Sequence, residues 1–300
     1  MEFYKQKDFG ELISTPFIFF GKQFKPFITG LVIFVGPFIL IESVLIGYFN
    51  FSPSNDLITQ IQTIGTNKSL SSYFIKFFEF FKNIMLYTYI GGYVKLFVNS
   101  RGQKTEIQDV WKEICRFYWP VAGGQILGGI IIAVGFILLV IPGIYLAVAL
   151  SPLFVVIIFE ESGISKSITR SFELIKRNWW MIFALFIVLF IMLTTASGVL
   201  YLLTEIVSPF ISQGAIFLTI SNLSELSFEG IISVFLILLP VFLYGHLIGE
   251  TEQLELRKKI NEIYTDNPDT EENENLSETE TKEEENRFLN DDTDRFKPKY

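Results

Sequence analysis

Cysteine, histidine and charged residues are all scarce in this 300-residue sequence. It contains one cysteine, Cys115, and one histidine, His246. A single cysteine excludes an intramolecular disulfide and a cysteine-rich metal site, and a single histidine excludes every mechanism that needs two. The sequence also lacks a Walker loop, a nucleophile elbow, an HExxH motif and a glycine-rich dinucleotide turn. We therefore expect no catalytic residue, no metal ion, no cofactor and no enzymatic activity.

Charge is low and apolar residues dominate. Charged residues make up 19% of the chain, against 50% hydrophobic residues and a mean hydropathy of +0.41. A soluble chain is nearer a quarter charged, so the composition predicts a membrane protein. The net charge of −8 comes from the C-terminus, where residues 250–300 carry 17 acidic and 8 basic residues. The near-neutral body offers no basic groove, which argues against nucleic acid as a partner.

Six apolar runs predict an all-α, polytopic fold with six transmembrane helices. An α-helix needs about 20 apolar residues to cross the hydrocarbon, at about 1.5 Å per residue. We expect the first run to be an uncleaved anchor, because Lys22 and Lys25 precede it and no small-residue cleavage pattern follows. The runs are Phe27–Phe49, Phe80–Val98, Phe117–Ile141, Ile144–Phe159, Trp179–Leu203 and Ile231–Ile248.

Two segments need a separate interpretation. The run from Phe117 to Phe159 is about twice the length of one crossing, so it must fold back, and we place the break at Pro142-Gly143. The segment Ile206–Phe228 is interrupted by polar residues and by proline. There we predict an interfacial or re-entrant helix rather than a seventh span.

Lysine and arginine predict the orientation. Fifteen of them flank the runs on one side, against two, Lys68 and Lys76, on the other. This asymmetry places both termini in the cytoplasm and the protein in the cell (inner) membrane. We expect an amphipathic cytoplasmic helix over 1–26, the membrane domain over 27–249, a cytoplasmic helix over 250–264 and a disordered acidic tail over 265–300. The tail would suit a basic protein partner.

Three segments resemble one another. In each, apolar residues at helical spacing lead into aromatic residues and then into an apolar run, as in Ile164–Ile175 before Trp179-Trp180. The other two copies lie over Phe9–Phe20 and Ile107–Tyr118. One interpretation is an internal repeat of a juxtamembrane amphipathic helix followed by a hairpin, and the other is the pattern that any helix at the headgroup level adopts. Such helices would anchor to the bilayer surface and bind anionic headgroups.

A family resemblance covers about half of the chain and is carried by residues 141–180. Ile141-Pro142-Gly143-Ile144-Tyr145, Glu160-Glu161, Arg170-Ser171-Phe172 and Trp179-Trp180 together resemble the membrane domain of glycerophosphoryl diester phosphodiesterases and related bacterial membrane proteins. Ser167 stands where we would expect a small alanine. The resemblance implies a fold and a location. In that family the hydrolase is a separate soluble barrel with histidine and metal-binding carboxylates, so the activity is not carried over.

Two functions remain as hypotheses. The first is a non-catalytic protein that organises or anchors partners in envelope or lipid homeostasis, and the second is a transporter or channel for a small solute or lipid. The second depends on the repeat and on Glu42, the one charged residue inside the first run. Glu42 would bind a cation or carry a proton, would pair with a backbone group or helix end, or would be solvated at a kink near Gly36-Pro37.

The remaining polar and small residues in the runs have structural interpretations. Gly124 and Gly128 form a GxxxG pattern that lets helices approach closely, with Gly91-Gly92 as the expected partner. Gln125 would donate an interhelical hydrogen bond beside them. His246 is expected at the headgroup level, where it would alternatively hydrogen-bond Glu250 four residues on.

Overall fold

The computed structural model describes residues 3–50, 67–102, 105–207 and 215–265, and its regular structure there is α-helical throughout. The all-α class is confirmed. The chain divides into two compact units, Met1–Ile248 and Gly249–Tyr300. The helices are α1 (Phe9–Lys22), α2 (Phe24–Phe34), α3 (Gly36–Asn50), α5 (Asn67–Asn99), α6 (Ile107–Leu138), α7 (Val140–Ala149), α8 (Leu153–Phe159), α9 (Ile164–Lys176), α10 (Trp179–Val207) and α11 (Ala215–Thr265).

Four helical segments are long and apolar enough to cross a membrane: Ile107–Leu138, Val140–Phe159, Trp179–Ala196 and Gly230–Thr251. Helices α1 and α2 add a fifth only if the pair, bent by 84°, counts as one span. The predicted span at Phe80–Val98 lies in α5 and is not among them; besides Lys82 and Lys95, its tyrosines lower the mean hydropathy of the segment. The described residues therefore support a protein with several membrane-spanning helices, while the count of six is not shown.

The first predicted span is broken. Helix α2 ends at Phe34 and α3 begins at Gly36, close to the kink expected at Gly36-Pro37. Upstream, α1 is the expected amphipathic helix, and its apolar side packs into the core through Leu12 and Phe19. Phe19 meets Phe27 of α2 edge-on at a ring separation of 6.0 Å, so the bend between α1 and α2 is filled with aromatic rings.

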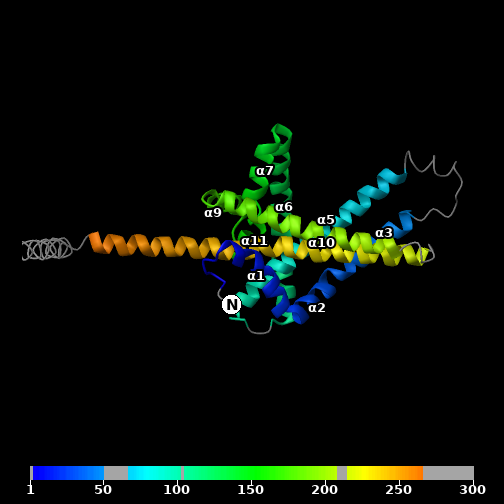
Figure 1. The fold of residues 1–300 in the computed structure, drawn as a ribbon, viewed down its shortest axis with the longest axis horizontal. Helices are drawn as coiled ribbons and strands as arrows, with labels where there is room; N and C mark the ends of the chain where they lie inside the picture. Colours follow the sequence, from blue (N-terminus) through cyan, green and yellow to red (C-terminus); the bar gives the residue numbers. More distant parts are fainter. Residues whose placement is uncertain (1–2, 51–66, 103–104, 208–214, 266–300) are drawn as a thin grey trace, which may run out of the picture. The chain divides into compact units, whose positions relative to one another are not determined.

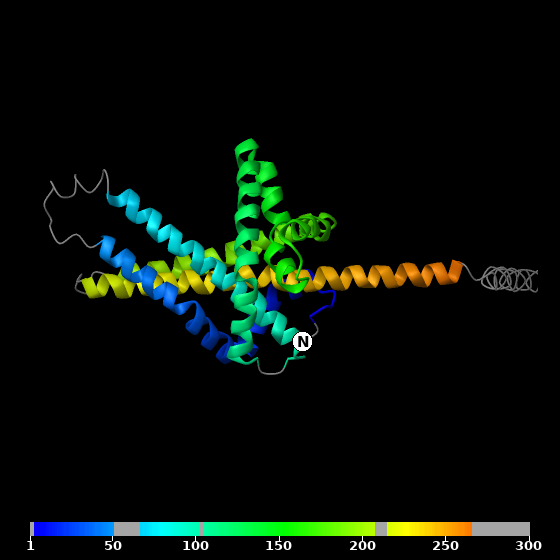
Figure 2. The ribbon, with the colours of Figure 1, turned by 180° about the vertical axis from the view of Figure 1, so that it is seen from behind.

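The hairpin within the long apolar run turns earlier than predicted. The break falls at Leu139, whose backbone is extended (φ −162°, ψ 151°), and Pro142 lies in the first turn of α7. Proline is tolerated in a first turn because the N–H that it lacks would have no helical acceptor there. Gly143 instead serves close packing: a Cβ on Gly135 would lie 3.1 Å from the Gly143 Cα. Helices α6 and α7 run side by side (Figures 1 and 2).

Two other boundaries differ from the predictions. The amphipathic segment at Ile107–Tyr118 and the span after it form one helix, α6, because Pro120 does not interrupt the helix. The residues expected as three pieces, an interfacial segment, a span and a cytoplasmic helix, form the single helix α11 from Ala215 onward. Residues 208–214 and 266–300, which include nearly all of the predicted tail, lie outside the described residues.

The centre of the core is α8. Its residues from Leu153 to Ile158 are all at most 4% exposed. A helix that is apolar on every side must be enclosed by others, and α8 packs against α5, α6 and α9. Enclosure of α8 fixes the position of the acidic pair that follows it, Glu160 and Glu161.

Candidate functional site: an ion-pair network after α8

Glu160 and Glu161 occupy the turn between α8 and α9. Glu160 caps α8, and Glu161 has a positive φ of 50°, a conformation that non-glycine residues seldom adopt. Such a backbone persists only where its surroundings hold it in place. Here oppositely charged groups from several helices hold the two carboxylates.

Glu161 joins α5 to α6. The Lys95 ammonium of α5 lies 2.8 Å from one Glu161 oxygen and 3.3 Å from Glu113, while the Arg116 guanidinium of α6 binds the other Glu161 oxygen. Lys95 also lies over the Phe117 ring, 4.5 Å from its centroid. The hydrogen bond from Lys95, reinforced by both cationic charges, lowers the pKa of Glu161 despite partial desolvation. The carboxylate therefore stays ionised at neutral pH.

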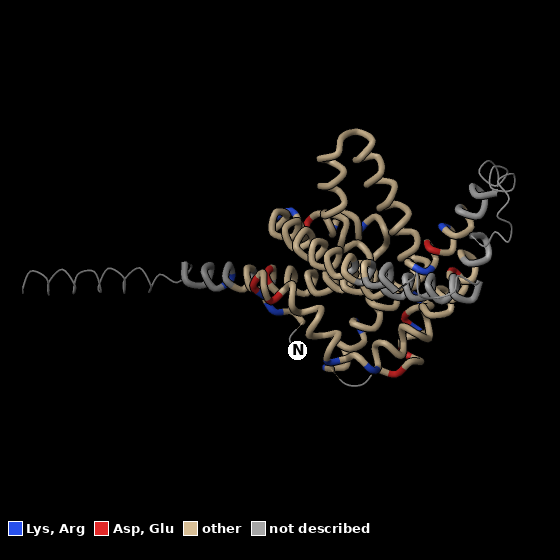
Figure 3. Tube along the Cα trace, turned by 45° about the vertical axis from the view of Figure 1, so that its right-hand side comes forward, with Lys and Arg blue, Asp and Glu red and all other residues tan. Residues whose placement is uncertain are grey.

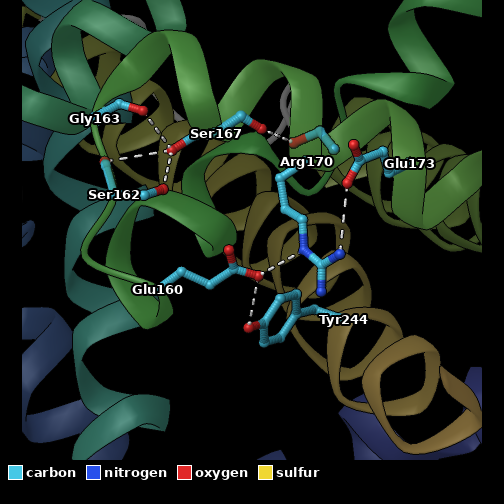
Figure 4. A network of polar contacts seen from close by, with 8 residues as sticks. Glu160, Ser162, Gly163, Ser167, Arg170, Glu173 and Tyr244 are labelled. Atoms are coloured by element: carbon cyan, nitrogen blue, oxygen red, sulfur yellow. Dashed lines mark hydrogen bonds and ion pairs between the residues drawn. The ribbon is translucent and has the colours of Figure 1, made fainter. Parts of the chain in front are cut away.

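Glu160 joins α9 to α11. Arg170 Nε of α9 donates to Glu160 Oε1 at 3.1 Å, and the Tyr244 hydroxyl of α11 donates to the same oxygen at 3.3 Å (Figure 4). Arg170 also lies 3.6 Å from Glu173. The two neighbouring glutamates thus bind in different directions, and together they connect four helices around α8.

The start of α9 packs through small hydroxyl side chains. Ser167 and Ser171 are fully buried. The Ser167 hydroxyl lies 2.7 Å from that of Ser162 and donates to the Gly163 carbonyl at 3.1 Å (Figure 4). This explains how a serine stands where the family resemblance suggested an alanine: its hydroxyl is satisfied locally, so burial costs little.

Glu42 lies in a second, separate ion pair. Its side chain is 4% exposed, and the Lys82 ammonium of α5, 12% exposed, binds it at 2.6 Å. Lys82 and Lys95 lie near the ends of the second apolar run, where lysine side chains are expected to reach the membrane surface and water, but Lys82 pairs with Glu42. Of the interpretations open for Glu42, none named Lys82, because residues 40 positions apart reveal their pairing only when α3 and α5 pack.

His246 is buried among the helices, and its expected place at the headgroup level stays a prediction. It is 3% exposed, and its Nδ1 accepts the backbone N–H of Lys7 at 3.0 Å. The neighbouring Gly245 lies so close to the Phe3 carbonyl that a Cβ would come within 2.6 Å of it. These contacts attach the N-terminal segment to α11, which is a structural role.

The glycine pattern in α6 accepts side chains from α8. A Cβ on Gly124 would lie 2.5 Å from the Ile157 Cδ1, and one on Gly128 would lie 3.1 Å from Leu153. The helix that packs on Gly124 and Gly128 is thus α8, not the predicted Gly91-Gly92 of α5. Gly91 itself accommodates Ile158, which also belongs to α8. Gln125 is half-buried beside this seam, and its role as a hydrogen-bond donor stays a prediction. Among the described residues no group of three or more metal-binding side chains occurs.

The ion-pair network after α8 lies in a region that matches a protein family. Residues 85–247 match the family described as domain of unknown function DUF7847, over more than half of the chain. The chain belongs to this family. Searches of the curated proteins and of the solved structures find no match. The DUF7847 region contains every charged residue of the network after α8, whereas Glu42 and Lys82 lie before it.

Sequence reasoning found part of the network in the DUF7847 region. It singled out Glu160, Glu161 and Arg170, but it placed Lys95 at a membrane surface and gave Tyr244 no role. Their separations along the chain, 66 residues for Lys95 to Glu161 and 84 for Tyr244 to Glu160, leave no periodic signal. The one sequence feature that could have indicated such a pairing was the presence of a lysine, Lys95, inside an apolar run.

Proposed function

We propose that this protein is a non-catalytic, multi-pass membrane protein that organises or anchors partners in envelope or lipid homeostasis. The observation that carries the proposal is the use made of the motif residues: Glu160, Glu161 and Arg170 tie helices to one another. Because these charged groups pair with one another between helices, they stabilise the helix packing and leave the outer surface apolar. A scaffold needs those two properties.

The resemblance to the membrane domain of glycerophosphoryl diester phosphodiesterases supports the same proposal. The residues that carry it fall within the DUF7847 region and include both glutamates of the network. The phosphodiesterase chemistry of that family uses histidine. Here the single histidine is buried and accepts a backbone N–H, so we propose the location of that family without its reaction.

We propose that both termini lie in the cytoplasm of a cell (inner) membrane protein. The support is the excess of lysine and arginine on one side of the apolar runs. The segment from α6 to α8 begins and ends on the same face of the membrane whether or not it crosses the bilayer, because Arg116 near its start binds Glu161 just after its end. The orientation of the termini is therefore independent of the depth of that hairpin.

The surfaces proposed for partners are the amphipathic helices and the acidic C-terminus. On α9, Lys166 and Lys176 are exposed while Leu174 and Ile175 are buried, so the helix can meet anionic headgroups with its basic side. The C-terminal residues, with their excess of acidic groups, suit a basic protein segment.

A transporter or channel is the second candidate, and the Glu42–Lys82 pair favours it. Two opposite charges held together inside a membrane protein are costly, and in transporters such pairs exchange protons or ions. In that function Glu42 would release Lys82 to bind a cation or a proton.

Reconstitution separates the two candidates. The purified protein in liposomes is assayed for release of loaded solutes and ions and for lipid scrambling, alongside empty liposomes and the Glu42→Gln variant. The scaffold proposal expects no flux above that of empty liposomes. Robust flux that Glu42→Gln abolishes, with equal protein incorporated, would overturn the scaffold in favour of transport.

A further inference from the structure

The tip of the α6–α7 hairpin carries only aliphatic side chains and is strongly exposed. Ile137, Leu138, Leu139, Val140 and Ile141 are 82%, 70%, 67%, 63% and 81% exposed. No charged residue occurs anywhere in the hairpin beyond Arg116, and Figure 3 shows its projecting part without charge. A turn emerging into water would leave these side chains solvated at a large hydrophobic cost.

A contact with α10 limits how deep the tip can lie. Trp179 Nε1 donates to the Tyr145 carbonyl at 3.4 Å, and the two rings stack at 5.6 Å. Trp179 begins the apolar helix α10 directly after Lys176, Arg177 and Asn178, so it marks the membrane interface where α10 enters. Tyr145 of α7 therefore lies near that same interface.

Tyr145 lies only six positions after Leu139, which corresponds to about 9 Å of helix. Even a hairpin running straight inward would bring its tip no deeper than about half of the roughly 30 Å hydrocarbon core, once the reach of the Trp179 side chain is added. The bound holds for every orientation of the hairpin. Figure 1 shows the hairpin standing across the direction of α10 rather than along it, which is consistent with this bound.

The opposite end of the hairpin is interfacial as well. The end far from the tip carries the charged network of Lys95, Arg116 and Glu161, whereas Trp179 contacts the hairpin at Tyr145, close to the tip. These two interfacial sites are separated by most of the length of the hairpin, which agrees with a hairpin that is only slightly inclined to the membrane plane. Helix α10 also exposes apolar side chains, among them Ile187 and Phe190.

We propose that the α6–α7 hairpin is a re-entrant wedge, whose tip is embedded among the acyl chains of the leaflet at which α10 begins and never reaches the far side. The span count predicted from sequence then falls by two, and both termini stay on one side. A wedge of this kind occupies area in one leaflet only. That gives a membrane-organising protein a direct means of acting on lipid packing.

Site-directed spin labelling of the full chain in liposomes tests the proposal. In a Cys115→Ser background, single variants Leu139→Cys and Ile141→Cys carry nitroxides, with Ile187→Cys on α10 as the hydrocarbon control and Ser165→Cys on α9 as the aqueous control. Collision with oxygen should exceed collision with a water-soluble nickel chelate at 139 and 141, as at 187. Both positions should also be unreactive toward an impermeant maleimide added to either face.

Two outcomes would overturn the wedge. Reaction of position 139 or 141 with the maleimide on the face opposite to position 165 would mean that the hairpin crosses. Low collision with both reagents, together with a disulfide between two copies at position 139, would mean that a second copy of the chain covers the tip. Two tip sites are labelled so that a folding defect in one variant does not decide the result.

Discussion

At the scale of single residues, the charged side chains inside the helices act as pairs. Glu42 and Lys82 are both largely buried and bind each other at 2.6 Å, while Lys95 binds two glutamates. Removal of one partner from a buried pair leaves the other charge without compensation, whereas removal of both leaves an apolar contact. This asymmetry makes the pairing testable by mutation.

We expect Glu42→Gln to lower the stability of the protein by about 3 kcal/mol, because Lys82 is left buried and unpaired. The double variant Glu42→Gln with Lys82→Met should recover most of the loss. Thermal unfolding in detergent, followed by size-exclusion fluorescence, measures both. Equal melting temperatures for wild type and Glu42→Gln would show that the pair contributes nothing.

The Glu161 carboxylate gives a pH dependence. Its pKa in the folded protein is lowered, chiefly by the hydrogen bond from Lys95, so the pair stabilises the fold fully above the ordinary glutamate pKa of about 4.3. That stabilisation is lost as the pH falls through the lowered pKa. It amounts to about 1 kcal/mol at most, because the side chain is partly exposed and water screens the charges.

The Glu161→Gln variant should therefore melt below wild type at pH 7, and the difference should shrink as the buffer is acidified toward pH values below about 4.3. Glu173→Gln, on the exposed side of α9, is the control and should match wild type throughout. A melting difference that is constant with pH would rule out ionisation of Glu161 as its origin.

At the scale of helices, the fold is assembled around α8. This helix is too short to be stable by itself, and its buried surface on every side makes it dependent on its neighbours. The glycines of α6 and α5 provide the space that its branched side chains fill. A defect at this contact should therefore weaken the whole membrane unit.

Gly124 and Gly129 form a matched pair for testing this packing. A Cβ at Gly124 would lie 2.5 Å from Ile157, whereas one at Gly129 would meet nothing within 4 Å. Gly124→Ala should destabilise by about 1 to 3 kcal/mol through overpacking. Gly129→Ala should be neutral or slightly stabilising, since alanine favours helix over glycine. Melting curves in one detergent compare them, and equal losses would contradict a specific contact with α8.

At the scale of the whole molecule, the orientation can be tested without any knowledge of function. In a Cys115→Ser background, Lys68→Cys should react with an impermeant maleimide on intact cells, and Lys166→Cys only after the cells are opened. Labelling of position 166 but not 68 on intact cells would reverse the proposed topology.

The C-terminal residues give a second test at this scale. Truncation after Tyr264 removes a segment rich in acidic and poor in apolar residues, which cannot bury enough surface to offset its chain entropy. Insertion and melting temperature should be unchanged. A clear drop in melting temperature would show that residues after Tyr264 dock on the rest of the protein.

The sequence by itself determined the features that depend on local composition. Apolar runs required helices that meet lipid, the spacing of Ile168, Ile175 and their neighbours predicted the amphipathic helix α9, and Gly36-Pro37 located the break before α3 within a residue. These follow from hydrophobicity and from backbone sterics, which act between near neighbours in the chain. Boundaries were less certain, because Pro120 and the polar residues before Gly230 do not end a helix whose other contacts sustain it.

Only the tertiary structure decided which distant residues meet. Lys82 with Glu42, Lys95 with Glu161, and Trp179 with Tyr145 are brought together by the packing of helices that are distant in the sequence, and no short-range pattern encodes those distances. The same reason explains the glycine seam, whose pattern predicted close packing but not its partner. A lysine in an apolar run can reach water or pair with an acid at similar local cost, so its choice depends on what the neighbouring helix offers.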